Sequence, residues 1–494
     1  MLIYTGHPLV DVGMATITVF SHKSKPEEVN TSDLENIADY MAQNYIVNPL
    51  RSFLTVAFPN SGFTQPAYFD APEKQAIYAE RVLRAFRTET PLLEEIDVFT
   101  GMQASAISFD VKGELPLGKA FRQHIPLLTG EDVINFHPCG GSGLPVSGLT
   151  LLAIQAFPLG CAKCGGRLLA VHSDNPEIMQ HFVGKFLEQN LSAVSLAQAG
   201  GGSKMPETHL KYRTLLIDTL LKAGAMQLEV QDVEPFSVTT YHLTNSGQGV
   251  DLAIYHLPSQ VIIYLKEMLS ADYVHTWSQI VSRAWELPKP QREQITIHPD
   301  FTPSRNHLYE DLFRVAENCL QYAPRFIRTY FLRDALRYVQ NNLADPRSRY
   351  SLKQDANLVS WKLTQSFLWR IMHMDNDRVK NIRDLGDALA DYVKGQNDKR
   401  FFYIFYSENR YGYLRNALIK ANTTYVKRGN PPFLTLDNYI CVFEDGEDLA
   451  QADWRLARDL VLIRMVEQLH KNGWLGDNQD AIPENVEETE SEAQ

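Results

Sequence analysis

Two glycine-containing segments hold the residues best suited to bind a metal. In CAKCGG, two residues separate Cys161 from Cys164, and two glycines follow. A zinc knuckle has this form because two thiolates on a tight turn must meet one ion. Upstream, FHPCGG supplies His137 and Cys139, and His172 competes for the fourth place. The pattern is equally consistent with a structural zinc site at His137, Cys139, Cys161 and Cys164 and with unligated thiols in glycine-rich loops.

The segment GHPLVDVG could serve catalysis because it places His7 and Asp11 close together in the sequence. A general base needs a partner within hydrogen-bonding distance, and no nucleophile motif accompanies these residues. We therefore interpret His7 and Asp11 as structural residues at a turn and at the start of a strand.

The polar loop QAGGGSK is a candidate for contacting phosphate. It lies between two predicted helices and matches neither nucleotide-binding glycine motif, so nucleotide hydrolysis is disfavoured. Its glycines would let the backbone approach a ligand closely, although a flexible linker has the same composition. The residues concerned are Gly200, Gly201, Gly202, Ser203 and Lys204.

A second polar loop, NSGQG, joins two predicted strands. Amide side chains can bond the edges of bases in a groove, and glycine permits close approach, but a plain turn has the same residues. If this loop reads DNA, the contacts come from Asn245, Ser246 and Gln248.

Charge is distributed unevenly along the chain, whose formal net charge is −12. Residues 305–428 contain 22 Lys and Arg against 13 Asp and Glu, whereas the remainder contains 25 against 46. The acidic total argues against general attraction to nucleic acid, but a basic segment can follow phosphates locally. Residues 476–494 contain seven acidic residues and no basic one, and we expect this tail to be disordered.

Aromatic residues interleave with the basic ones in KRFFYIFYSENRYGYLR. This mixture suits single-stranded nucleic acid, because bases stack on rings while phosphates pair with cations. Much of the aromatic content must nevertheless be core, and solvated helices are the simpler interpretation. The basic residues that we expect to contact a nucleic-acid backbone are Arg325, Arg328, Arg333, Arg337, Lys399, Arg400, Arg410 and Arg415.

The chain is long enough for two or three domains. Residues 1–300 alternate strand-like and helix-like segments, including a helix behind a capping box at Ser32 and Glu35 and a hairpin over residues 51–69. Residues 301–475 follow a helical apolar pattern. We therefore expect an α+β N-terminal region with mixed strands and helices and a zinc-knuckle insert at 135–172, followed by an all-α C-terminal helical bundle.

The sequence indicates a cytoplasmic protein. No window is apolar enough for a membrane helix, and the N-terminus lacks the pattern of a signal peptide. In a reducing cytoplasm, five cysteines indicate metal binding or inert thiols in place of disulfides. We expect Cys319 and Cys441 to be buried in the core.

Three blocks resemble one known family: TGHPLVDVGMATI, SGLPVSGLTLLAIQAFPLGCAKCGGRLLAVHSDNPE and YHLTNSGQGVDLAIYHLP. On these blocks the chain resembles the CXXC-CXXC family, the large subunits of type I-B CRISPR surveillance complexes, called Cascade. The blocks lie in the N-terminal two thirds, and the helical part carries no family motif. The family name describes two CxxC pairs, whereas here His137 and Cys139 stand in place of the first pair. Histidine is a competent zinc ligand.

The resemblance implies a non-catalytic subunit of an RNA-guided ribonucleoprotein for antiviral defence or transposon targeting. In such complexes the guide RNA reads the target, while protein reads the PAM duplex and holds the displaced strand of the R-loop. The helical bundle is then small-subunit-like, and structural zinc is the one cofactor implied. The implied partners are CRISPR guide RNA, target double-stranded DNA, the Cascade backbone, 5′-handle and small subunits, and a helicase-nuclease or transposition targeting protein.

Two alternative functions differ in what they predict. A zinc-dependent nuclease or hydrolase would use His7, Asp11 and the cysteine region, and added metal should then give turnover on nucleic acid. A structural scaffold would touch no bases, so replacing Asn245 and Gln248 by alanine would leave PAM discrimination unchanged.

Overall fold

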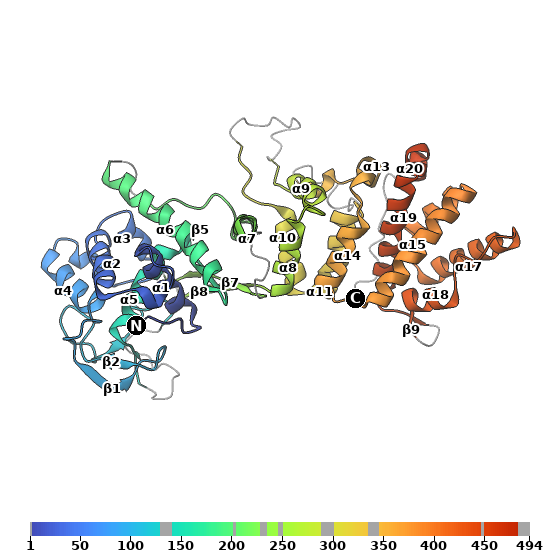
Figure 1. Ribbon diagram of the computed structural model, residues 1–494. Helices are drawn as coiled ribbons and strands as arrows, with labels where there is room; N and C mark the ends of the chain where they lie inside the picture. The colour runs from blue at the N-terminus through green and yellow to red at the C-terminus, as the bar shows by residue number, and fades with distance from the viewer. Residues whose placement is uncertain are drawn as a thin grey trace. The chain divides into compact units, whose positions relative to one another are not determined.

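The computed structural model describes residues 2–128, 141–200, 204–227, 235–245, 250–287, 301–333, 345–445 and 449–482. The chain forms two compact units, each with its own set of internal contacts; their elements are labelled in Figure 1. Unit 1 comprises Met1–Tyr212 and Glu229–Ser259, and unit 2 comprises Arg213–Leu228 and Gln260–Gln494. The division therefore falls earlier than the expected boundary at residue 300.

Unit 1 is built around a buried helix, α1 (Pro8–Phe20), where we had predicted the start of a strand. Pro8 occupies the first turn, where proline is favoured because its missing N–H would have no partner there. Every residue from Leu9 to Thr18 is buried. A short apolar run suits a buried helix as well as a buried strand, which is why the periodicity misled us.

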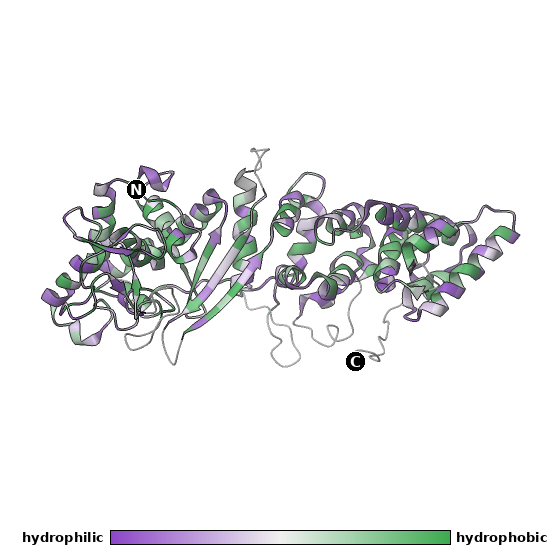
Figure 2. Ribbon diagram, turned by 90° about the horizontal axis from the view of Figure 1, so that it is seen from below, coloured by the Kyte–Doolittle hydropathy of each residue, from purple (hydrophilic) through white to green (hydrophobic). Residues whose placement is uncertain are grey.

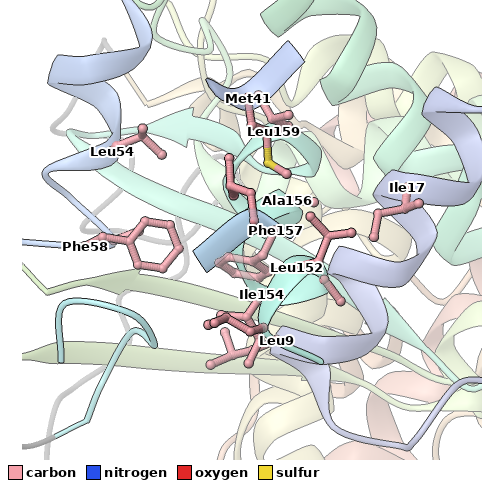
Figure 3. Close-up of a cluster of buried hydrophobic side chains, with 14 of the residues drawn as sticks. Leu9, Ile17, Met41, Leu54, Phe58, Leu152, Ile154, Ala156, Phe157 and Leu159 are labelled. Carbon is pink, nitrogen blue, oxygen red and sulfur yellow. The ribbon is translucent and has the colours of Figure 1, made fainter. Parts of the chain in front are cut away.

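Helix α5 (Gly148–Ala156) packs directly against α1. A Cβ at Gly13 would lie 1.9 Å from the carbonyl oxygen of Ala153, so the two backbones touch at this point. Figure 3 shows Leu9 and Ile17 of α1 gathered with Leu152 and Ile154 of α5 in the same apolar cluster. The close approach explains why the segment GHPLVDVG needs its second glycine.

Several helices and short turns complete the helical part of unit 1. The capping box of α2 is formed by Asn30 and Asp33, two residues before the predicted Ser32 and Glu35. The predicted hairpin over residues 51–69 is wrong, because α3 and a 3₁₀ turn occupy this segment. The bounds are η1 (Pro26–Glu28), α2 (Thr31–Asn44), α3 (Leu50–Leu54), η2 (Pro66–Tyr68), α4 (Pro72–Leu83), η3 (Phe157–Gly160) and α6 (Pro176–Gln198).

The main sheet of unit 1 has four antiparallel strands in the order β5-β6-β7-β8. They are β5 (Ala162–Cys164), β6 (Arg167–Ser173), β7 (Val238–Thr244) and β8 (Asp251–Leu257). The predicted strands on either side of residues 245–249 are confirmed as the antiparallel pair β7 and β8. Two smaller pairs join β1 (Leu92–Ile96) to β2 (Gln103–Ser105) and β3 (Lys119–Ala120) to β4 (Leu144–Pro145).

Unit 2 is helical in its described residues, apart from the two-residue strands β9 (Glu444–Asp445) and β10 (Leu449–Ala450). The predicted change from an α+β region to an all-helical region is thus confirmed. Its first helices are α7 (Tyr212–Gln227), α8 (Ser259–Met268), α9 (Val274–Arg283), α10 (His307–Glu317), α11 (Cys319–Phe326), a π-helical turn η4 (Ile327–Phe331), η5 (Pro346–Arg349), α13 (Leu352–Asp355), η6 (Ala356–Leu358) and α14 (Trp361–Arg370).

The last part of unit 2 packs around α19, which is buried along most of its length. Helix α15 lies beside α19, and α16 contacts it as well (Figure 1). Figure 2 shows hydrophilic and hydrophobic residues on the same helices, as expected of amphipathic elements. The bounds are α15 (Asn376–Gln396), α16 (Lys399–Ser407), α17 (Tyr411–Lys427), α18 (Leu436–Phe443), α19 (Trp454–Lys471), α20 (Trp474–Asp477) and η7 (Gln479–Ala481).

Within the described ranges, the structure contains no helix that combines the length and the apolar character needed to cross a membrane.

Candidate nucleic-acid interface

Helix α17 combines exposed aromatic and basic side chains more clearly than the other predicted sites. Its inner side buries Leu414, Leu418 and Ala421. Near its C-terminal end, Tyr425 packs edge-on against Tyr392 of α15, with ring centroids 5.4 Å apart. Most other residues of this helix are exposed or half-buried, so α17 offers a long surface to solvent.

The exposed surface of α17 follows a helical repeat. Tyr413, Lys420 and Lys427 occupy every seventh position and therefore share one side of the helix. Successive members of this set are about 10 Å apart along the axis, from the rise of 1.5 Å per residue. We call Tyr413, Lys420 and Lys427 the α17 face. It presents one ring and two ammonium groups in a row.

The cations of the α17 face have no carboxylate beside them on their own helix. Residues 409–436 contain five basic residues and no acidic one. Lys420 and Lys427 are exposed, and neither ammonium group has an ion pair or hydrogen bond to a described residue. Exposed cations without partners keep their attraction for phosphate, which neighbouring carboxylates would otherwise weaken.

Tyr413 is 58% exposed, and its ring carries the guanidinium of Arg410 at 3.8 Å from its centroid. Arg410 also forms an ion pair with Glu408, with Nε 3.0 Å from Oε1. On α16, Tyr403 is 52% exposed one turn after the exposed Arg400. Exposed rings beside guanidinium groups are the arrangement on which unpaired bases stack.

The other residues predicted in this segment are partly engaged. Lys399 pairs with Asp480 at 2.9 Å. Arg415 is half-buried, with Nε 3.9 Å from Oε1 of Glu444. Arg400 and Arg410 thus remain the more accessible cations among the four predicted between residues 399 and 415.

The earlier group of predicted basic residues is not a surface row, which corrects that expectation. Arg328 donates from Nε to Oδ2 of the buried Asp459 at 2.6 Å. Arg333 is 1% exposed and stacks on the ring of Tyr350 at 4.6 Å from its centroid. Burial lowers the pKa of Arg333 to about 10. Arg333 is thus buried and Arg328 is half-buried in an ion pair, so their spacing reflects the packing of the segment.

Arg325 is half-buried beside Asp311 and Arg314, where the three line a narrow recess. Burial lowers the pKa of Arg325. Arg337, the last of the predicted group, lies outside the described residues.

Asn245 directly follows β7, but its side chain is held inside unit 1. Its Nδ2 donates to the carbonyl oxygen of Ala57 at 3.1 Å, and the residue is fully buried. Arg122 in turn donates from Nη2 to the carbonyl oxygen of Asn245 at 2.7 Å. The predicted contact of Asn245 with a base edge therefore does not fit this arrangement. Ser246 and Gln248 lie outside the described residues.

The glycine-rich loop is described only at its edges. Gly200 follows α6 with a φ of +92°, a conformation that glycine adopts without strain. A Cβ at Gly200 would meet no described residue within 4 Å beyond its chain neighbours. Lys204 is exposed. The predicted residues Gly201, Gly202 and Ser203 lie outside the described part of the chain.

The segment CAKCGG forms a β-hairpin between β5 and β6. Cys164 pairs with Arg167, and the two residues of the turn, Gly165 and Gly166, have φ values of +60° and +76°. Turns of this kind require positive φ at both positions, which accounts for the two glycines. A hairpin turn thus explains the two glycines after Cys164, which a zinc knuckle would explain equally well.

The two thiols of this hairpin contact different surroundings. Cys161 belongs to the apolar core of unit 1, and its Sγ lies 3.1 Å from the carbonyl oxygen of Phe157. Cys164 lies three positions later on an extended segment, which turns its side chain to the other side, and its Sγ lies 3.8 Å from the carbonyl oxygen of Leu210. The two Sγ atoms thus contact backbone carbonyl oxygens of different segments.

Burial raises the pKa of both Cys161 and Cys164, which keeps the thiols protonated. Among the described residues, no group of three or more His, Cys, Asp and Glu side chains is arranged to hold a metal. His137 and Cys139 lie outside those residues, so the four-residue zinc set stays a prediction.

Asp11 has a structural role that fits our interpretation of the segment GHPLVDVG. It is 2% exposed and accepts hydrogen bonds from the N–H groups of Thr5 at 2.6 Å and Gly6 at 2.8 Å. His172 of β6 lies 3.3 Å from Oδ2 of Asp11. Burial alone would raise the pKa of Asp11, but these hydrogen bonds outweigh it and lower the pKa. The carboxylate fixes the segment before α1, and its oxygens are occupied.

Sequence reasoning missed Lys420, Lys427 and the two exposed tyrosines as individual candidates. The usable signal was the stretch of residues 409–436 without a single acidic residue. The charge of residues 305–428 as a whole does not show this stretch, because it includes the acidic residues before it and the buried Arg333.

No protein-family model, curated protein or solved structure matches the chain.

Proposed function

We propose that the chain is the non-catalytic large subunit of a type I-B CRISPR RNA-guided DNA surveillance complex. In this role it recognises the PAM duplex, stabilises the R-loop and recruits a helicase-nuclease or a transposition targeting protein. The three sequence blocks in unit 1 support the family, and the α17 face supports contact with nucleic acid. The observation that carries the proposal furthest is the α17 face, because its cations have no partner among the described residues and its ring is exposed.

The composition of the α17 face favours a single strand over a duplex. Lys420 and Lys427 would pair with phosphates, and Tyr413 would stack on an unpaired base. A duplex keeps its bases stacked on each other, so a contact with its backbone alone would gain little from an exposed ring. The displaced strand of an R-loop provides both unpaired bases and phosphates. We therefore assign the α17 face to that strand.

The first test is purification of the tagged chain after expression with its neighbouring genes, followed by sequencing of bound RNA. We expect a stoichiometric guide RNA together with repeating backbone subunits. A protein that purifies alone and free of RNA would contradict the proposal. The same preparation, incubated with oligonucleotides and added Zn²⁺ or Mg²⁺, should show no cleavage by this subunit, whereas a nuclease would cleave.

The second test measures how the assembled complex holds a target whose displaced strand is labelled. Replacing Lys420 and Lys427 by alanine should weaken binding. It should also reduce the magnitude of the slope of log K against log salt by about 1.4, because each contact with a single-strand phosphate contributes about 0.7. Tyr413→Ala should weaken binding by roughly 5- to 150-fold, from about 1–3 kcal/mol for each stacked base, without changing that slope.

Lys380→Ala is the matched control for the lysine variants. Lys380 is an exposed lysine near the start of α15, and its ammonium group has no partner among the described residues. Lys380→Ala should leave both the affinity for the target and the slope of its salt dependence unchanged. Equal effects of the Lys380 and α17 variants would show that general charge, and not the α17 face, is responsible.

A further inference from the structure

Unit 2 contains two segments of opposite charge. The α17 helix and its flanks carry five basic residues and no acidic one over residues 409–436. Residues 483–494 carry five glutamates and no basic residue. These residues follow η7, so the place where η7 sits decides which cations the glutamates can reach.

The segment that includes η7 is anchored beside the start of α16. Asp480 pairs with Lys399, with Nζ 2.9 Å from Oδ1. Just before η7, the ring of Trp474 packs 5.5 Å from the ring of Phe402, and its Nε1 donates to Oδ1 of Asn397 at 2.9 Å. An acidic residue of the 476–494 segment thus already pairs with Lys399, which we had predicted to contact nucleic acid.

The C-terminal end of α17 lies next to the same corner. Arg428 donates from Nη1 to Oε1 of Gln396, the last residue of α15. Asn397 follows Gln396 directly and is the partner of Trp474. The described chain ends at Ile482, directly after η7, and so it stops near the basic end of α17.

Length and charge make α17 reachable from that point. A chain of twelve residues spans at most about 40 Å when extended. The 17 residues of α17 extend for about 25 Å along the helix axis. Residues 483–494 can therefore run along the helix, where Lys420 and Lys427 have no described partner.

We infer that the acidic segment 483–494 docks on the α17 face and competes there with nucleic acid. The contact extends the ion pair of Asp480 with Lys399 along α17, with glutamates in the place of phosphates. The docked segment and a strand of nucleic acid then exclude each other from the α17 face. The competition rests on the proposed function, whereas the docking itself does not.

Docking is tested without nucleic acid. The probe is a labelled synthetic peptide of residues 483–494, added to the full chain in which the five glutamates of that segment are replaced by glutamine. We expect saturable binding that weakens as salt rises, because exposed charges are screened. Lys420→Glu with Lys427→Glu should abolish binding, and Lys380→Glu should leave it unchanged. The inference is overturned if the peptide does not bind, or if Lys380→Glu weakens peptide binding as much as the α17 substitutions do.

Competition is tested with a labelled single-stranded oligonucleotide at low salt. A tethered segment acts at an effective concentration of the order of millimolar, so even a weak contact should lower affinity about threefold or more. The chain with the five glutamates should therefore bind the oligonucleotide about threefold more weakly than the glutamine variant. Adding the peptide to the glutamine variant should restore the weaker binding.

The two experiments fail in different ways. If neither chain binds the oligonucleotide, the proposed contact of α17 with nucleic acid is wrong, and the peptide titration still decides the docking. If both chains bind the oligonucleotide equally while the peptide binds α17, the competitive role is overturned.

Discussion

The ion network around Asp459 offers the sharpest test of how unit 2 is held together. Asp459 lies in α19 and is 1% exposed, and its Oδ2 accepts from Arg328 Nε at 2.6 Å. Its Oδ1 accepts from Nη2 of Arg458 at 2.6 Å, and Arg458 is 4% exposed. Arg458 also donates from Nη1 to the carbonyl oxygen of Glu408. A single carboxylate therefore compensates two guanidinium groups and links α19 to η4 and to the end of α16.

The substitution Asp459→Asn keeps the size of the side chain and removes the charge. It removes the carboxylate that pairs with the buried Arg458 and the partly buried Arg328. Loss of one partner of a buried pair costs about 3–5 kcal/mol. A unit of this size shifts its unfolding temperature by about 2–4 °C per kcal/mol. We therefore expect a fall on the order of 10 °C for the transition of unit 2.

Tryptophan fluorescence reports this transition selectively. All six tryptophans of the chain lie in unit 2. Urea unfolding followed at their emission should give the free energy of unfolding of unit 2. The matched control is Asp384→Asn on α15, because Asp384 is exposed and lies 3.4 Å from Arg383. Exposed pairs contribute about 0–1 kcal/mol, so this control should stay close to the parent protein.

The pH dependence of stability provides a second readout of the same network. Burial alone would raise the pKa of Asp459, but the charges and hydrogen bonds of Arg328 and Arg458 outweigh it, so the folded pKa is lowered. The carboxylate therefore stabilises the folded state above its unfolded pKa of about 3.9, and this stabilisation is lost as pH falls below that value. Asp459→Asn should flatten the acid limb. A loss under about 1 kcal/mol with an unchanged acid limb would refute the reasoning.

Three further predictions concern unit 1. Gly13→Ala should destabilise unit 1 by about 3 kcal/mol or more, because the new Cβ would lie 1.9 Å from the carbonyl oxygen of Ala153. Gly184→Ala is the control and should be tolerated, because its Cβ would lie 3.6 Å from Val19. Thermal unfolding followed by circular dichroism compares the two variants. Burial lowers the pKa of His124 to about 4, so unit 1 should lose about 3 kcal/mol of stability as pH falls from 6.5 to 4, and the imidazole should not titrate above pH 5 by NMR. A fully buried Cys161 with a raised pKa should react with a thiol reagent only after unfolding, and fast labelling of the native protein at Cys161 would contradict its position in the core.

The sequence predicted most where local pattern and tertiary contacts agree. The strands on either side of residues 245–249 alternate apolar and polar residues, and they pair as expected. The helices α2, α4 and α6 show an apolar stripe, a cap or an N-terminal proline that identifies them without any partner. The sequence misled us over residues 51–69, where apolar residues stand close together and length alone cannot separate a strand from short helical turns.

The sequence predicted which types of residue form the candidate site, but it did not identify the individual residues that are exposed. Basic and aromatic residues near the end of the chain indicated contact with nucleic acid, and α17 lies within that segment. Spacing could not tell a surface arginine from a buried one, so Arg328 and Arg333 were grouped with Arg410. An arginine with an acidic partner distant in the sequence looks the same as a free one until the fold brings Asp459 beside it.

By itself, the sequence determined the order of an α+β region and a helical region, the acid-free stretch that became α17, and the acidic composition of residues 476–494. These properties depend on composition and on short periodicities, which the chain carries before it folds. The tertiary structure alone decided which charges are available. It buried Asn245 and Arg333, paired Lys399 with Asp480, and turned Cys161 and Cys164 toward different surroundings. Availability depends on burial and on partners far apart in sequence, and only the folded chain brings those together.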